Sequence, residues 1–341
     1  MPYLLGIDIG ESTVTAAICP PTGPAQPVVL GSSGAAVAAT LLVSPSGGLV
    51  AADSSPEHAQ QAEQATGFVR RVGDDVSVWF ANRAVSAQAL VAEMVGWTVG
   101  RLWQQQGEAP ERIAVAHPTD WGPYRLGLLR AAFDEAGLGE PALVPRAGAV
   151  VTAFQAAGQL PTRGTVLLVF RLGGTSLEVS LVNLHLSGQY ELIASLECTD
   201  IRGADLAAAD TAAQRSILQA GVDLAARTVA ACRVQPTDLA AVLLAGGAAG
   251  HPMLTDLLAV AFPVPILLRD DPQLTVACGA ALSVRPRVRQ AATAPAPAVA
   301  EFPSAQALVA EAGEAVAPGP QAGLPPPRPP VRVTAAPTGR K

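Results

Sequence analysis

The strongest constraint on the fold of this chain is an internal repeat. The segment Leu4–Thr13, LLGIDIGEST, has a counterpart near the middle of the chain in Leu167–Ser176, LLVFRLGGTS. In each copy an apolar stretch leads through one polar residue into a turn of glycine and hydroxyl-bearing residues. A second apolar stretch follows each turn, Val14–Cys19 in the first copy and Leu177–Leu184 in the second. The repeat predicts two similar halves that each begin with a β-hairpin.

The rest of the chain as far as Arg285 alternates between strand-like runs and helical patterns, which is typical of an α/β protein. Apolar residues at helical spacing predict a long helix over Val85–Gln106, and a shorter helix is expected over Ala149–Ala157. An Ala-rich stretch, Ala204–Val234, is expected to be mostly helical. We therefore expect a first lobe over residues 1–160 and a second lobe over residues 161–285.

The last segment of the chain, residues 286–341, differs in composition from the rest. It holds 12 of the 30 prolines, including the run PPPRPP at residues 325–330. Such a segment cannot bury enough apolar surface to offset the entropy cost of ordering it, so we predict a disordered tail with polyproline II character. Two interpretations of the proline run stay open, a ligand for a protein partner with an aromatic groove or a simple spacer.

Charge and composition exclude several classes of function. The formal net charge is −6 and the isoelectric point is about 5.3, so we expect no nucleic-acid or anionic-membrane surface. No apolar run is long enough for a membrane span, and the N-terminus lacks the basic region of a signal peptide, so a cytoplasmic location is expected. The 4 cysteines lie too far apart for a CxxC motif, and we predict no metal site.

The repeated turns have a composition that suits oxyanion binding. Glycine lets the backbone approach a ligand closely, and successive N–H groups can then point at one oxyanion. Two such turns facing each other would hold a polyphosphate from both sides. A third glycine-rich turn, Leu244–Pro252, follows a predicted strand and precedes a predicted helix, which suits a base or ribose. An ordinary structural role is the alternative for each turn taken alone.

Several motifs, in this order, resemble the nucleotide-binding domain of the heat-shock protein 70 chaperone family, which belongs to the actin-like ATPase superfamily. They are Gly6–Gly10, Phe68–Gly73, Ile113–Pro118, Leu172–Thr175, Leu243–Gly247 and Ala277–Ala281. The resemblance implies an α/β, two-lobed, ribonuclease H-like fold that closes on ATP or ADP. The second lobe would be shortened, because the segment between Gly203 and Gly246 is too short for the subdomain that the family carries there. No counterpart of the family's peptide-binding domain follows.

The resemblance also implies which residues would bind the nucleotide. Asp8, Gly10, Ser12 and Thr13 would form the first phosphate turn, and Gly173, Gly174 and Thr175 the second. Gly203, Gly246, Gly247 and Ala248 would border the sugar and base. Three arginines complete the set: Arg70, Arg146 and Arg171.

These arginines are where the chain departs from the family. The family's catalytic lysine falls on Arg70, its hinge glutamate on Arg146, and the aspartate that opens its second phosphate motif on Arg171. Mg²⁺ requires oxygen ligands, so the loss of carboxylates makes a bound Mg²⁺ doubtful. Whether the protein is an enzyme stays open, because arginine can neutralise phosphate charge but cannot accept a proton from water.

Three interpretations of the arginines follow. In the first, Arg146 and Arg171 pair with Asp8 and Glu178, and the chain is an interaction scaffold that no longer binds nucleotide. In the second, the chain is a chaperone-related protein that binds a nucleotide with little or no metal and with weak or absent hydrolysis. In the third, it is a conventional ATPase.

Overall fold

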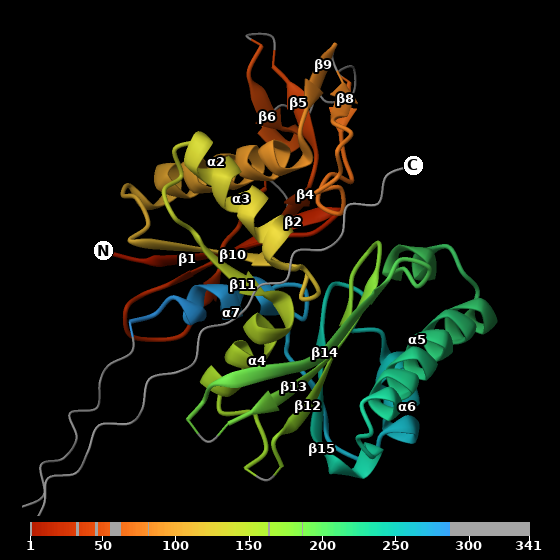
Figure 1. Cartoon of the computed structure of the whole chain (residues 1–341). Helices are drawn as coiled ribbons and strands as arrows, with labels where there is room; N and C mark the ends of the chain where they lie inside the picture. The colour runs from red at the N-terminus through yellow and green to blue at the C-terminus, as the bar shows by residue number, and fades with distance from the viewer. Residues whose placement is uncertain are drawn as a thin grey trace, which may run out of the picture. The chain divides into compact units, whose positions relative to one another are not determined.

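The computed structural model describes residues 2–31, 34–44, 47–54, 63–80, 82–162, 164–185 and 187–286 (Figure 1). Met1–Arg287 group into one compact unit, and Val288–Lys341 group into a second. The second unit, and with it the tail for which the sequence predicts disorder, lies outside the described residues.

The first sheet is built around the hairpin of the first sequence repeat. Its strands lie in the order β11-β10-β1-β2-β3, with β4 also pairing with β2. Strands β1 and β2 are antiparallel, whereas β10 and β11 continue the sheet in parallel from β1. The strands are β1 (Leu4–Ile9), β2 (Thr13–Cys19), β3 (Gln26–Pro27), β4 (Ala36–Ala38), β10 (Arg112–His117) and β11 (Ala142–Pro145).

The second sheet repeats this arrangement around the second hairpin. Its order is β14-β13-β12-β15-β16, with β12, β13 and β14 antiparallel and β15 and β16 parallel to β12. The strands are β12 (Val166–Leu172), β13 (Leu177–Leu184), β14 (Tyr190–Cys198), β15 (Leu239–Ala245) and β16 (Ile266–Leu268). The two halves predicted from the internal repeat, each beginning with a β-hairpin, are therefore confirmed. The chain is an α/β protein with two mixed sheets.

The helices and the smaller strands complete the described residues. The α-helices are α2 (Ala87–Gln106), α3 (Pro123–Glu135), α4 (Arg146–Ala156), α5 (Thr211–Ala231), α6 (Pro252–Ala261) and α7 (Thr275–Ser283). Short 3-10 turns are η1 (Ala52–Ser54), η2 (Gly203–Ala207) and η3 (Pro236–Asp238). Two small antiparallel sheets consist of β5 (Leu41–Val43), β6 (Leu49–Ala51) and β7 (Gln64–Ala65), and of β8 (Val78–Phe80) and β9 (Arg83–Val85).

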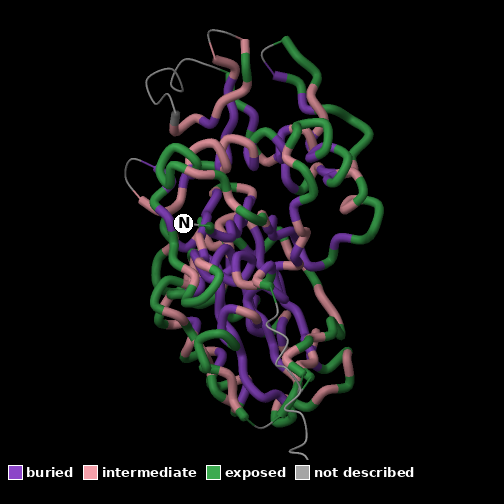
Figure 2. The backbone as a smooth tube through the Cα atoms, turned by 90° about the vertical axis from the view of Figure 1, so that its left-hand side faces the viewer, coloured by how far each residue is buried: buried purple, intermediate pink, exposed green. Residues whose placement is uncertain are grey.

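The helices cover both sheets in layers (Figure 1). Helices α2 and α3 pack on the outer face of the first sheet, and α5 and α6 pack on the outer face of the second. Helices α4 and α7 lie between the two sheets and share one apolar cluster with residues of both. Figure 2 shows this middle region as the most continuous stretch of buried backbone. Side chains that point inward from either sheet therefore lie in the same layer as α4 and α7.

The alternation of side chains along the two central strands decides which residues point inward. In β1, Leu5 packs in the outer cluster and Leu4 in the middle one, so Asp8 shares the inner face with Leu4. In β12, Phe170 packs in the outer cluster and Val169 in the middle one, so Arg171 lies on the inner face. The same alternation in both repeats therefore points Asp8 of the first hairpin and Arg171 of the second hairpin toward the middle layer.

Two glycines allow β1, α7 and α4 to pack closely against one another. A Cβ on Gly6 of β1 would lie 2.2 Å from the carbonyl oxygen of Ala277 in α7. A Cβ on Gly279 of α7 would lie 1.8 Å from the carbonyl oxygen of Ala149 in α4. In both cases the obstruction is backbone, which has no alternative rotamer to adopt. The close contact of β1, α7 and α4 therefore depends on these glycines.

The sequence predicted most of these elements and missed some boundaries. The long helix begins at Ala87 because the Ser86 side chain accepts a hydrogen bond from the N–H of Ala89, and Gly107 in the left-handed conformation ends it. Helix α4 begins at Arg146, three residues before the expected start. The Ala-rich stretch divides into η2 and α5. Strand β14 and the short strands β3 to β9 were not predicted.

Candidate functional site

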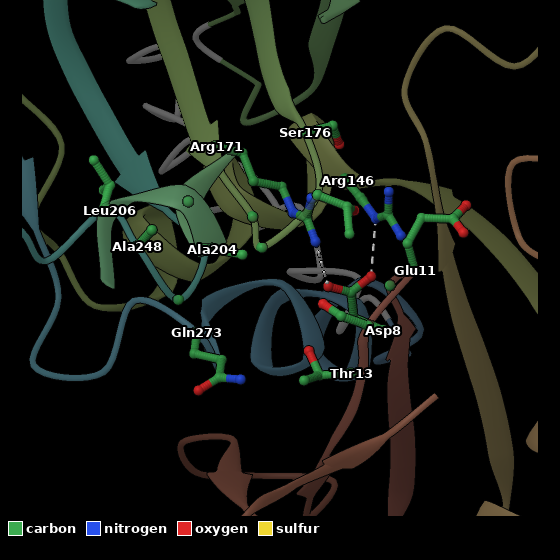
Figure 3. A pocket seen from close by; sticks show the side chains of 18 of the residues that line it. Asp8, Glu11, Thr13, Arg146, Arg171, Ser176, Ala204, Leu206, Ala248 and Gln273 are labelled. Carbon is green, nitrogen blue, oxygen red and sulfur yellow. Dashed lines mark hydrogen bonds and ion pairs between the residues drawn. The ribbon is translucent and has the colours of Figure 1, made fainter. Parts of the chain in front are cut away.

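The residues proposed from the sequence line one cavity of about 590 Å³ between the two sheets (Figure 3). All fourteen are among its lining residues: Asp8, Gly10, Ser12, Thr13, Arg70, Arg146, Arg171, Gly173, Gly174, Thr175, Gly203, Gly246, Gly247 and Ala248. The volume falls in the range of about 300–1,000 Å³ that is typical of small-molecule sites. The fold therefore brings all fourteen residues to the wall of one cavity.

The two repeated turns have the same hydrogen bond at the same place. In the first turn the N–H of Gly10 donates to the carbonyl of Thr13 at 2.8 Å, and in the second the N–H of Gly173 donates to the carbonyl of Ser176 at 2.9 Å. A Cβ on Gly174 would lie only 2.8 Å from the Ser12 hydroxyl, so the turns face each other across the cavity. The duplication thus produces a pair of opposed, closely similar turns.

Several amide groups in these turns remain available to a ligand. The backbone N–H groups of Glu11, Ser12, Gly174 and Thr175 donate to no acceptor within the described residues. All four residues line the cavity. Free amides on two opposed, glycine-containing turns are the arrangement that binds oxyanions.

Asp8 lies at the centre of the site and is held by two arginines. Its Oδ1 accepts a hydrogen bond from Arg146 Nε at 2.9 Å, and its Oδ2 accepts one from Arg171 Nη2 at 3.2 Å. Arg146 Nη2 also donates to the carbonyl of Ile9 at 2.7 Å. All three side chains are buried, and Figure 3 shows both guanidinium groups directed at the carboxylate. Both oxygens of Asp8 are therefore already used within the protein.

Electrostatics fix the ionisation of this group of three residues. Burial opposes ionisation of Asp8, but the two guanidinium charges outweigh it, so the pKa of Asp8 lies below its ordinary value. Burial likewise opposes the charged form of Arg146, yet the Asp8 and Glu178 carboxylates hold the pKa of Arg146 above its ordinary value. Asp8 is accordingly a carboxylate flanked by two cations, and its negative charge is not free to attract a metal ion.

Glu178, the second carboxylate expected to pair with the arginines, is placed differently. It forms no ion pair within 4.0 Å among the described residues. Instead its Oε1 accepts a hydrogen bond from the Thr119 hydroxyl, which in turn accepts the N–H of Ala147 at 2.9 Å. Its Oε2 is buried without a partner, and burial raises the pKa of Glu178 despite the nearby arginines. The expected pairing thus holds for Asp8 and not for Glu178.

Arg70 occupies the rim of the cavity. Half of its side chain is exposed, and its Nε lies 3.5 Å from Oε2 of Glu11. Its backbone N–H also donates to Glu11 Oε1. Burial raises the pKa of Glu11 against the opposing effect of Arg70. Arg70 is therefore the arginine of the site with the most freedom to change partner.

The third glycine-rich turn closes the side of the cavity away from Arg70. Gly246 has a φ of 95°, and a Cβ there would lie 2.3 Å from the carbonyl oxygen of Leu172. Gly203 packs equally closely, with a virtual Cβ 2.5 Å from the carbonyl oxygen of Gly173. These glycines let the third turn and η2 lie directly against the second turn.

Sequence reasoning missed several lining residues. They are Glu11, Thr15, Pro118, Ser176, Glu197, Ala204, Leu206, Ala207, Gln214, His251 and Gln273. Glu197 comes from β14, a strand that was not predicted, and accepts a hydrogen bond from the Ser176 hydroxyl at 2.6 Å. His251 was interpreted as part of a turn, yet its Nδ1 is buried without a partner beside the cavity. Glu11 and Ser176 lie within the two repeated turns, whereas no sequence pattern connects the other residues, because distant elements bring them together.

Comparisons with known proteins add no identity. The sequence matches no model of a known protein family, and no curated protein matches it either. No helix in the described part of the chain is both long and apolar enough to cross a membrane. Within those same residues, no group of three or more His, Cys, Asp or Glu side chains is placed to hold a metal ion.

Proposed function

We propose that this protein binds a nucleotide, ATP or ADP, in the cavity around Asp8 without a catalytic Mg²⁺, and that it hydrolyses the nucleotide slowly or not at all. In this proposal the fold is a two-lobed actin-like ATPase fold, and the chain is a degenerate relative of the heat-shock protein 70 chaperones. The matching strand order of the two sheets supports that fold. The motifs quoted from the sequence support the family.

The observation that carries nucleotide binding is the set of free backbone amides on the two opposed turns. Glu11 and Ser12 belong to the first turn and Gly174 and Thr175 to the second, and all four residues line the cavity. Phosphoryl oxygens accept hydrogen bonds from such groups without any metal. The Ser12 and Thr13 hydroxyls line the same region and add further donors.

The opposite side of the cavity fits the nucleoside. Leu206, Ala207 and Ala248 give it apolar surface, while Gln214 and Gln273 carry carboxamides that can both donate and accept hydrogen bonds. Figure 3 shows Leu206 and Ala248 on one side of the open space, with Gln273 below them. We expect one face of the base to stay exposed, because only η2 and the start of α5 border it.

The pairing of Asp8 explains why the proposal omits Mg²⁺. A cation here would have to displace Arg146 or Arg171 from a buried carboxylate, and it would then meet a second positive charge. The residues present therefore do not fit a Mg²⁺ ion at this position. The arginines themselves can neutralise phosphate charge by moving part of their hydrogen bonding to the ligand.

The same pairing argues against efficient hydrolysis. Activation of a water molecule requires a group that accepts its proton, and Asp8 has both oxygens engaged. Glu11 is engaged with Arg70, and Glu197 with Ser176. Among the described lining residues, every carboxylate therefore already has a partner.

A second candidate function, an interaction scaffold that binds no nucleotide, is favoured by the charge of the lining. Its three arginines are matched by three carboxylates, Asp8, Glu11 and Glu197, so the described lining has no excess positive charge. A polyphosphate would gain less here than in a cationic site. The two candidates differ in one measurable property, which is the affinity for nucleotide.

The test is thermal unfolding of the full chain with ATP or ADP, in EDTA and in Mg²⁺. A ligand that binds only the folded state raises the melting temperature by mass action. We expect the same increase with and without Mg²⁺, and no detectable phosphate release. If neither nucleotide raises the melting temperature, the chain is an interaction scaffold that binds no nucleotide. If the increase requires Mg²⁺ and phosphate is released, the chain is a conventional ATPase.

A substitution pair locates the binding. Gly247 lines the cavity, and its Cβ position has no heavy atom closer than 3.6 Å, so Gly247→Gln fills the cavity without backbone strain. Gly127→Gln on α3 is the matched control, because its Cβ position meets nothing within 4 Å and lies outside the cavity. We expect Gly247→Gln to weaken nucleotide binding at least tenfold and Gly127→Gln to leave it unchanged.

A further inference from the structure

A second cavity lies at the opposite ends of α4 and α7 from the Asp8 pocket. Helix α4 begins at Arg146 in the large cavity and ends beside the small one, which Ala153, Ala156 and Ala157 help to line. The small cavity has a volume of about 380 Å³. Its remaining lining residues are Gly23, Pro24, Ala25, Arg269, Cys278, Leu282 and Arg285.

The two arginines of this cavity lack a carboxylate partner. No acidic residue is among the lining residues, and neither Arg269 nor Arg285 forms an ion pair within the described part of the chain. Arg269 Nη1 donates to the carbonyl of Ala153 at 3.3 Å and to Gln159 Oε1 at 3.2 Å. Both acceptors are neutral, so the positive charge of Arg269 is not compensated by them.

Arg285, like Arg269, donates hydrogen bonds to acceptors other than carboxylates. Its Nη2 donates to the Cys19 sulfur at 2.7 Å and to the carbonyl of Gly23. Its Nε is buried and has no acceptor. A buried N–H of a guanidinium group without an acceptor is costly, and a ligand oxygen would satisfy it.

Other charges near the cavity do not cancel these two. The C-terminal end of α4 contributes only about half a negative charge. Asp271 is close enough to affect the Cys278 thiol but does not line the cavity. Burial raises the pKa of Cys278 to about 11, so this thiol is neutral at physiological pH. Among the residues that line the cavity, Arg269 and Arg285 are therefore the only charged side chains.

We propose that this cavity binds a small organic carboxylate, with its oxygens between Arg269 and Arg285 and its aliphatic body against the alanines, Pro24 and Leu282. Guanidinium groups bind the planar carboxylate through paired hydrogen bonds. The mostly apolar wall favours an anion with a short hydrocarbon chain over a fully hydrated inorganic anion. This site is separate from the nucleotide cavity and does not depend on what that cavity binds.

Cys278 provides a reporter inside the cavity, because a reagent must enter to reach its sulfur. The test measures alkylation of the full chain by neutral iodoacetamide at about pH 9, where part of the thiol is ionised and can react. The products are resolved by peptide mass spectrometry, with sodium butyrate, acetate, phosphate or chloride at equal ionic strength. We expect butyrate to slow alkylation of Cys278 several-fold, acetate to slow it less, and phosphate and chloride to have little effect. Cys198, which lies outside the cavity, should react at the same rate throughout.

Substitutions then assign the protection to the arginines. Arg269→Gln and Arg285→Gln should each remove most of the protection, whereas Arg83→Gln should retain it. Arg83 is a matched control, because it also donates to a backbone carbonyl, that of Gly47, but lies elsewhere in the chain. Thermal unfolding checks that each variant folds, and either single variant is sufficient if the other does not.

Two results would overturn the proposal. If butyrate slows the alkylation of Cys278 no more than chloride does, the cavity binds no carboxylate. Protection that persists in both folded arginine variants, or that is as strong with phosphate as with butyrate, would mean that the ligand chemistry is wrong.

Discussion

The two cavities of this protein use arginine in opposite ways. In the large cavity, Arg146 and Arg171 share one carboxylate, Asp8, and all three side chains are buried. In the small cavity, Arg269 and Arg285 donate to backbone carbonyls, to the Gln159 carboxamide and to the Cys19 sulfur, and to no carboxylate among the described residues. The first pair holds the two sheets together through a charge within the protein. The second pair forms no ion pair among the described residues, so a ligand would have to displace a carboxylate in the large cavity but not in the small one.

The same two helices form part of both cavities. Helix α4 runs from Arg146 to the alanines of the small cavity, and α7 runs from a position just after Gln273 toward Leu282 and Arg285. They contact each other so closely that only glycine fits at position 279. The contrast between the cavities is therefore a contrast between the two ends of one rigid helix pair.

The largest expected effect comes from removing the shared carboxylate. Asp8→Asn keeps the shape of the side chain but leaves two buried guanidinium groups without their counter-charge. We expect a loss of about 3–5 kcal/mol in the free energy of unfolding, measured by urea denaturation. Arg285→Gln, which breaks no ion pair, should cost about 1 kcal/mol or less.

The control for Asp8→Asn is Asp205→Asn, which removes a carboxylate from the exposed pair with Arg202. That change should alter the free energy of unfolding by less than about 1 kcal/mol. Equal effects of Asp8→Asn and Asp205→Asn would contradict the distinction between the cavities. It would mean that the buried pairs at Asp8 contribute no more than a surface pair.

The second prediction compares the two cavities by the pH dependence of the free energy of unfolding. Burial lowers the pKa of His117, next to the large cavity, from 6.5 to about 4. The unfolded chain binds this proton at the ordinary pKa, so stability is complete above that pH and falls as the pH decreases toward 4. His117 alone should account for a loss of about 2 kcal/mol between pH 7 and pH 5.

Replacing His117 by Gln should remove that part of the pH dependence, as measured by urea denaturation at several pH values. A His117→Gln variant with the same slope as the wild type would show that His117 does not resist protonation. At the small cavity the corresponding buried group is Cys278, whose pKa of about 11 places its titration in alkaline solution.

The third prediction tests the helix pair that joins the cavities. Gly279→Ala places a methyl group against the backbone of Ala149, so α4 and α7 must separate. We expect a loss of about 1–3 kcal/mol in the free energy of unfolding. Gly127→Ala in the exposed part of α3 should instead gain up to about 1 kcal/mol, since alanine is the better helix former. A Gly279→Ala variant as stable as the wild type would mean that the helices are not tightly coupled.

Most of the architecture was predictable from local patterns. The repeat at Leu4 and Leu167 indicated both hairpins, and alternating apolar runs indicated the strands that flank them. Strand β14 escaped prediction because several of its residues are exposed, including Leu192, Ile193 and Leu196. An edge strand with apolar residues on its open face does not show the alternation that identifies a half-buried strand.

The candidate site likewise contains residues that the sequence predicted and residues that it missed. Glycine and hydroxyl residues of the turns were found because each turn is continuous in sequence. Glu197, Gln214 and Gln273 were missed because each belongs to a separate element whose own pattern has nothing unusual. Their role depends only on the relative position of the two sheets.

Local patterns alone indicated that the chain has two similar halves and that each carries a glycine-rich turn. That Arg146 and Arg171 stand where carboxylates were expected is implied only by the resemblance to a known family. The partner of each arginine depended instead on how the two sheets pack. The alternation along one strand fixes the face to which a side chain points, but the charge that the side chain meets is set by a different sheet. Asp8 and Arg171 lie far apart in the sequence, and their contact exists only because α4 and α7 hold the two inner faces together.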